Sequence, residues 1–123
     1  MKIYKILEGT LKTSFFLLVG DTPKEADKYI RKRIIEDIAE AKSYDGFFVT
    51  GTNEKGATRD FIWVEKFNGT PNDIAILSHE LVHLVFHNFN SMGAGVSLTM
   101  DEPIAYTHSY LLEQSLNKLR KKK

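Results

Sequence analysis

The sequence contains no cysteine, which excludes disulfide bonds, thiolate metal sites and cysteine nucleophiles. No apolar stretch is long enough to cross a bilayer, and the run from Phe15 to Val19 is too short for the core of a secretory signal. The formal net charge is only +1, so the fold as a whole gives no reason to expect binding to nucleic acid or to an anionic membrane. These absences predict a cytoplasmic protein that depends on its hydrophobic core, with or without help from a metal.

The length of 123 residues is that of one ordinary domain, so we expect a single domain over residues 1–123. Hydrophobic residues make up 42% of the chain and charged residues 27%, which is typical of a soluble globular protein. A local excess of positive charge occurs from Arg120 to Lys123. A run of this kind at a chain end is interpreted as a solvated tail.

The pattern of apolar residues and turn signals predicts four strands and three helices. The two helix starts at Thr22-Pro23 and Thr70-Pro71 each combine a capping residue with a proline in the first turn. The expected strands are 2–8, 13–19, 46–51 and 59–67, with turns at Gly9-Thr10 and around Asn53 and Gly56, and the expected helices are 23–42, 71–88 and 99–119, with a loop over 90–98. The order ββαββαα predicts an α+β fold with a small, mostly antiparallel sheet packed with three helices.

The segment from His79 to His83 matches the pattern H-E-x-x-H. Residues four apart lie on one face of a helix, so the imidazoles of His79 and His83 can converge on one zinc ion. Glu80 points to another side and can reach a water on the ion, which suits a general base. The flanking residues are apolar nearly all round, so we expect a buried helix, in which a metal would give both histidines a partner. The alternative is that both histidines are ordinary polar residues of the helix.

A catalytic zinc usually has three protein ligands, and Glu102 is the preferred third candidate. It lies near the start of the last helix, although Thr99-x-x-Glu102 is also a capping box in which Glu102 would only bond the backbone. Asp101 is the second candidate. The metzincin pattern would need a histidine where this chain has Phe89, so that pattern is not met. His87 lies about 12 Å along the helix from His79, so His79 and His87 cannot both bind an ion that His83 also binds.

Tyr106 lies one helical turn beyond Glu102 and is a candidate donor to the oxyanion that forms when water attacks a carbonyl. An ordinary packed tyrosine is the alternative interpretation. His108 falls about 240° around the same helix from Glu102, so we expect it to face elsewhere.

The two segments His79-Glu80-Leu81-Val82-His83 and Glu102-Pro103-Ile104-Ala105-Tyr106 together resemble the gluzincin-type metallopeptidases. The Glu-x-x-Ala-Tyr form is similar to small zincin-like proteins of phage and bacterial genomes. The resemblance, which covers about residues 70–115, implies that His79, His83 and Glu102 bind zinc and that Glu80 is the base. It also implies that a strand before the zinc helix lines the cleft, here Arg59 to Phe67, whose edge would pair with an extended peptide.

These observations predict a zinc-dependent hydrolase, most plausibly a small metallopeptidase that acts on a peptide or protein substrate. The alternative is a zinc-binding or assembly module of zincin-like fold without turnover. A nuclease is a third hypothesis, based on the basic tail and on the general reactivity of water activated by zinc. The sequence indicates neither the oligomeric state nor the substrate.

Overall fold

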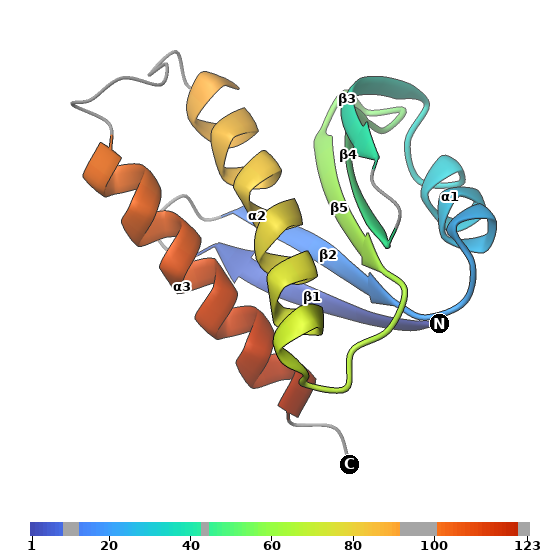
Figure 1. Ribbon diagram of the computed structural model, residues 1–123. Helices are drawn as coiled ribbons and strands as arrows, with labels where there is room; N and C mark the ends of the chain where they lie inside the picture. The colour runs from blue at the N-terminus through green and yellow to red at the C-terminus, as the bar shows by residue number, and fades with distance from the viewer. Residues whose placement is uncertain (9–12, 43–44, 92–100, 121–123) are drawn as a thin grey trace.

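The computed structural model describes residues 1–8, 13–42, 45–91 and 101–120, which form five strands and three helices (Figure 1). In chain order the elements are β1 (Lys2–Glu8), β2 (Thr13–Val19), α1 (Pro23–Arg31), β3 (Glu36–Lys42), β4 (Gly46–Thr52), β5 (Thr58–Val64), α2 (Pro71–Ser91) and α3 (Asp101–Arg120). The predicted α+β class and the three helices are confirmed. The element order is ββαβββαα, with one strand more than predicted.

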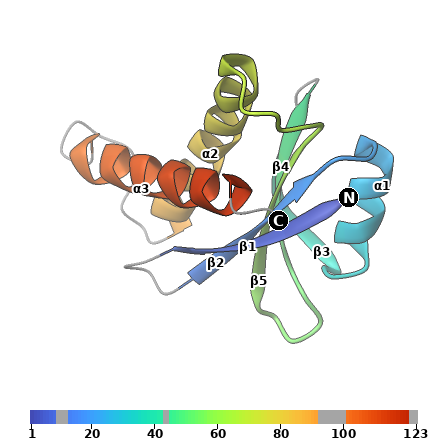
Figure 2. The same ribbon diagram turned by 90° about the horizontal axis from the view of Figure 1, so that it is seen from below.

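The strands form one sheet in the order β1-β2-β5-β4-β3 (Figure 2). The pairs β1–β2, β3–β4 and β4–β5 are antiparallel, as expected for a mostly antiparallel sheet. The central pair β2–β5 is parallel, so the sheet is mixed. β5 therefore lies between two neighbours, and the strands at the ends of the sheet are β1 and β3.

The first helix was predicted to continue to about Lys42, and this prediction is wrong. α1 ends at Arg31, and residues 36–42 form β3. Alanine, glutamate and lysine in this segment favour a helix locally, but pairing with β4 outweighs that weak preference. Ile35 precedes the new strand and already bonds β4, because its backbone N–H donates to the carbonyl of Thr52 at 2.8 Å.

The remaining boundaries differ from the predictions by a few residues. β5 ends at Val64 rather than at Phe67, and α2 continues through Asn90 and Ser91, which were expected in a loop. The loop of the β4–β5 hairpin contains Asn53, as expected, whose Oδ1 accepts from the backbone N–H groups of Lys55 and Ala57. The predicted turn at 9–10, most of the loop at 90–98 and most of the basic tail lie outside the described residues.

The sheet carries a hydrophobic core on each face. α2 and α3 pack on one face and α1 on the other, as Figures 1 and 2 show. Alternating side chains of each strand go to opposite faces, so β5 sends Ile62 and Val64 toward α2 and Phe61 and Trp63 toward α1. None of the described helices is long and apolar enough to span a bilayer.

Candidate metal centre

The helix that carries the His-Glu-x-x-His segment begins with a reciprocal cap. Thr70 Oγ1 accepts from the backbone N–H of Asp73 at 3.1 Å, and Asp73 Oδ2 accepts from the N–H groups of Asn68 and Thr70. The bond from Asn68 is the main reason that the pKa of Asp73 lies below its ordinary value. These bonds fix the start of α2, while Leu77, Leu81 and other apolar residues anchor one face on the sheet.

The sequence had suggested that α2 is buried on all sides, but one side of the helix is exposed to solvent. Val82 is 39% exposed and Phe86 is 40% exposed, because only one face of α2 packs on the sheet. His79 is exposed and His83 is half-buried, so both imidazoles lie where a ligand from solvent can reach them.

The two histidine rings are close enough to share one ion. Their centroids lie 5.0 Å apart, with the ring planes at 79°. A metal bound at 2.0–2.1 Å lies about 3.2 Å from the centre of an imidazole, so two rings on a tetrahedral ion have centres roughly 5.2 Å apart. The observed separation therefore fits a zinc ion held by His79 and His83.

The side chain of Glu80 lies between the backbone of α2 and the start of β4. Its side chain is 1% exposed, and it follows His79 by 100° and lies 60° from His83 around the helix. A Cβ at Gly46 would come within 3.3 Å of Glu80 Oε2 and 2.9 Å of the carbonyl oxygen of Trp63. The absence of a side chain at Gly46 therefore leaves room for the carboxylate of Glu80 at the start of β4.

The third ligand cannot be assigned from described side chains. Asp101 and Glu102 are the first residues of α3, and their side chains lie outside the described set. Among the side chains that are described, no group of three histidines, aspartates or glutamates surrounds a common point.

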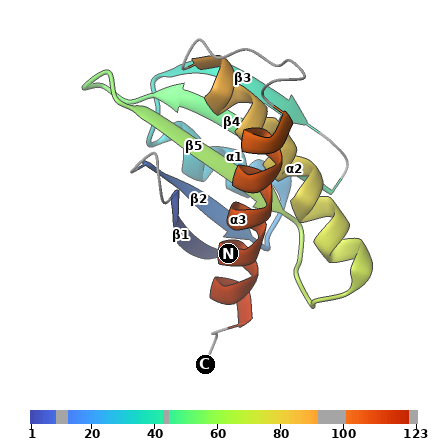
Figure 3. The same cartoon turned by 90° about the vertical axis from the view of Figure 1, so that its left-hand side faces the viewer.

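The start of α3 lies on the side of the Ser78–His108 contact that is nearer the end of α2. α3 runs back along α2 at an oblique angle, as Figure 3 shows, and His108 contacts Ser78. Glu102 precedes His108 by six residues, about 9 Å along the axis of α3. Ser78 marks the face of α2 that contacts α3. His79 and His83 lie about 100° and 140° around the axis of α2 from Ser78, so neither histidine points directly at α3.

Tyr106 is 72% exposed, so the alternative interpretation of a packed tyrosine is wrong, and its role as a donor to an oxyanion stays a prediction. His108 was expected to face elsewhere, but it faces α2, because its Nε2 lies 3.1 Å from Ser78 Oγ and 3.2 Å from the Ser78 carbonyl oxygen. His108 therefore joins α3 to the residue that precedes His79, a contact between positions 30 apart that no local pattern indicates.

A buried polar cluster, formed by Asp60, Thr50 and His87, was also missed. Asp60 of β5 is 7% exposed, and the hydroxyl of Thr50 on β4 donates to Asp60 Oδ1. His87 packs on Phe48 with ring centroids 5.9 Å apart. Burial raises the pKa of Asp60, while the bond from Thr50 and a positive charge on His87 act in the opposite direction. The period-two alternation of β5 was the available signal, since Asp60 is in phase with Ile62 and Val64.

The raised pKa of Asp60 predicts a pH-dependent stability. Since burial makes the folded pKa higher than the ordinary value of 3.8, the stabilisation is complete below that value and is lost as the pH rises through the folded pKa. Asp60→Asn removes this titration. We expect the wild type to lose stability relative to the variant as the pH is raised from about 3 to about 7, measured by urea unfolding. A relative gain over that interval would mean that attraction to His87 outweighs burial.

The strand expected to offer its edge to a peptide cannot do so. β5 is hydrogen-bonded to β2 on one side and to β4 on the other. The end of the sheet nearest the histidine helix is β3, since β3 pairs with β4 and α2 packs over β4. An extended substrate would therefore pair with β3.

Comparisons with protein-family models, with curated proteins and with solved structures gave no match. The functional assignment therefore depends on the residues and geometry given above.

Proposed function

We propose that this protein is a zinc-dependent hydrolase that cleaves peptide bonds, with His79 and His83 as zinc ligands. The observation that carries the proposal is the pair of imidazoles one turn apart, with centroids 5.0 Å apart, on the helix that also carries Glu80. A zinc ion supplies a Lewis acid that lowers the pKa of water toward 7 and polarises the scissile carbonyl.

The chain's own residues supply the proton transfers. Glu80 accepts a proton from the attacking water and then donates it to the leaving amine. Its packing at Gly46 restricts the side chain, so the carboxylate is oriented before substrate arrives. Tyr106, being exposed, is available to donate to the developing oxyanion once substrate is bound.

Glu102 is the third ligand in this proposal. Support comes from its place in the first turn of α3, the helix that contacts α2 through His108 and Ser78. Two histidines and a glutamate form a hydrolytic zinc shell with one open position. A peptide substrate is supported by β3, since an extended chain can add to the end of a sheet by backbone hydrogen bonds.

A zinc-binding module without turnover is the second candidate, and the burial of Glu80 favours it. The carboxylate of Glu80 is 1% exposed and packs against β4, so its role in this second candidate is to position α2. In that case zinc would stabilise the fold and no substrate would be cleaved.

The test is hydrolysis of a dye-labelled, unstructured protein by the zinc-loaded chain. We expect cleavage that is lost when a chelator removes the metal and is restored by added zinc. Labelled RNA and single-stranded DNA in the same assay should stay intact. Bound zinc with no cleavage, together with unfolding on chelation, would instead support the module without turnover.

A further inference from the structure

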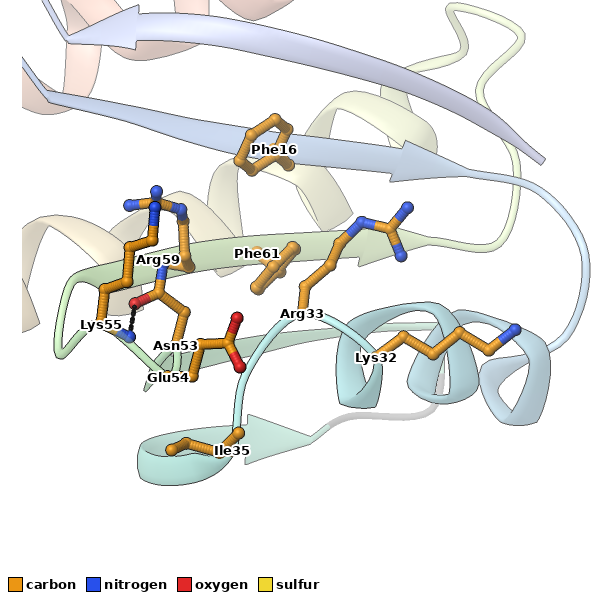
Figure 4. Close-up of a pocket in the computed structure, with 9 residues that line it drawn as sticks. All are labelled: Phe16, Lys32, Arg33, Ile35, Asn53, Glu54, Lys55, Arg59 and Phe61. Carbon is orange, nitrogen blue, oxygen red and sulfur yellow. Dashed lines mark hydrogen bonds between the residues drawn. The ribbon is translucent and has the colours of Figure 1, made fainter.

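The face of the sheet opposite α2 carries a second site that the proposed hydrolysis does not use. α1 has nine residues and covers only part of this face. Next to it lies a pocket of about 500 Å³, between β2, β5, the segment after α1 and the β4–β5 hairpin (Figure 4). Its volume is in the range that holds a small organic ligand.

The floor of this pocket is aromatic. Phe16 of β2 and Phe61 of β5 are partners in the parallel register, and their rings stack with centroids 5.7 Å apart and planes at 25°. Phe61 is 1% exposed and forms part of the core, whereas Phe16 is only half-buried. The ring of Phe16 is therefore held by its contact with Phe61 and is still partly exposed, so a flat apolar group can stack against it.

The rim is basic, although the chain as a whole is nearly neutral. Four cationic side chains line the pocket, Lys32, Arg33, Lys55 and Arg59, against the one carboxylate of Glu54. Figure 4 shows that Lys55 and Arg59 come from the hairpin end and Lys32 and Arg33 from the α1 end, with the aromatic rings between them. The four cations form no ion pair with any side chain that the structure describes.

Two of these cations are held by their own contacts. Arg33 Nη1 donates to the carbonyl of Tyr29 at 2.9 Å, and its guanidinium lies 3.4 Å from the centroid of the Tyr29 ring. Arg59 Nη1 donates to the carbonyl of Thr58 at 3.1 Å. Each of these guanidinium groups keeps further N–H donors, which match the geometry of a phosphate.

We propose that this pocket binds a nucleotide, either as a free molecule or as part of a single strand. The base stacks on Phe16, the phosphate lies at the hairpin end of the pocket beside Lys55 and Arg59, and Glu54 accepts from an amino or hydroxyl group of the ligand. Inorganic phosphate alone would leave the aromatic floor unused, and an uncharged aromatic ligand would leave the cations unused. The inference goes beyond the proposed hydrolysis and revises the expectation of no nucleic acid, which net charge alone had suggested.

The test is calorimetric titration of the full chain with AMP, adenosine, inorganic phosphate and a short single-stranded DNA. AMP or the DNA should bind more tightly than adenosine or phosphate, since only they combine the base with the charge. AMP binding identifies a free nucleotide, and binding of the DNA alone identifies a strand; both support the proposal. Equal affinity for phosphate and AMP, or no binding of any probe, overturns it.

Variants separate a built site from general attraction to a basic surface. Lys55→Ala and Arg59→Ala should each weaken binding about tenfold, because each removes a charged contact to phosphate. Lys118→Ala on α3 is the matched control and should leave the affinity unchanged. Phe16→Leu keeps the site apolar and should reduce the preference for AMP over phosphate. If Lys118→Ala weakens binding as much as Arg59→Ala, the pocket is not the site.

Discussion

Replacing Glu80 by glutamine is expected to abolish hydrolysis while zinc remains bound. Glutamine has the shape of glutamate and can occupy the space beside Gly46, but it cannot take a proton from water. Loss of a general base lowers turnover by about 10²- to 10⁴-fold. The turnover number should be measured on zinc-loaded protein, together with the zinc content of the same sample.

The control for this variant is Glu113→Gln, which makes the same change at an exposed position of α3. It should keep the activity of the wild type. Equal turnover in the wild type and in Glu80→Gln would reject the mechanism. A Glu80→Gln variant that changes only the unfolding free energy, with no activity in either protein, would assign Glu80 the structural role that its burial also permits.

The elements that could be predicted from sequence are those specified by neighbouring residues. The start of α2 follows from Thr70, Pro71 and Asp73. The hydroxyl of Thr70 and the carboxylate of Asp73 each accept a hydrogen bond from the backbone N–H of the other residue, three positions away. β1 and β2 follow from their apolar composition and the intervening glycine. The spacing of His79 and His83 is likewise local, so their common helix face could be predicted before any coordinates.

β3 was missed because the composition of its residues favours a helix. Pairing with the next strand, β4, outweighs that local preference and makes them a strand. The centre of the sheet was missed for another reason, since β5 pairs in parallel with β2 across more than forty residues. That pairing removed the edge that a peptide was expected to use.

The parts of the site that were missed are also contacts between distant segments. His108 bonds Ser78 across 30 positions, and Asp60 of β5 lies near His87 of α2. The basic pocket is another case, since its cations come from the segment after α1, the β4–β5 turn and β5, and its aromatic floor from β2 and β5. Charge counted along the chain could not detect them, because acidic residues elsewhere balance the total.

Removing either histidine of the pair is expected to abolish zinc binding. Loss of a residue that only supports a ligand lowers metal affinity about 10- to 100-fold, so His79→Ala and His83→Ala should each cost more than about a hundredfold. Glu102→Ala should also weaken binding if its carboxylate is the third ligand. The dissociation constants should be measured by competition with a zinc indicator, with elemental analysis of the purified proteins.

His87→Ala is the matched control, because it removes an imidazole one turn further along the same helix. His87 packs on Phe48 beside the buried Asp60, and its distance along α2 from His79 prevents both from binding one ion. Its zinc affinity should equal that of the wild type. Weakening by His87→Ala with none by His79→Ala would move the metal one turn along α2 and separate it from Glu80. If Glu102→Ala binds zinc unchanged while both histidine variants lose it, the third ligand comes from elsewhere and the histidine pair stands.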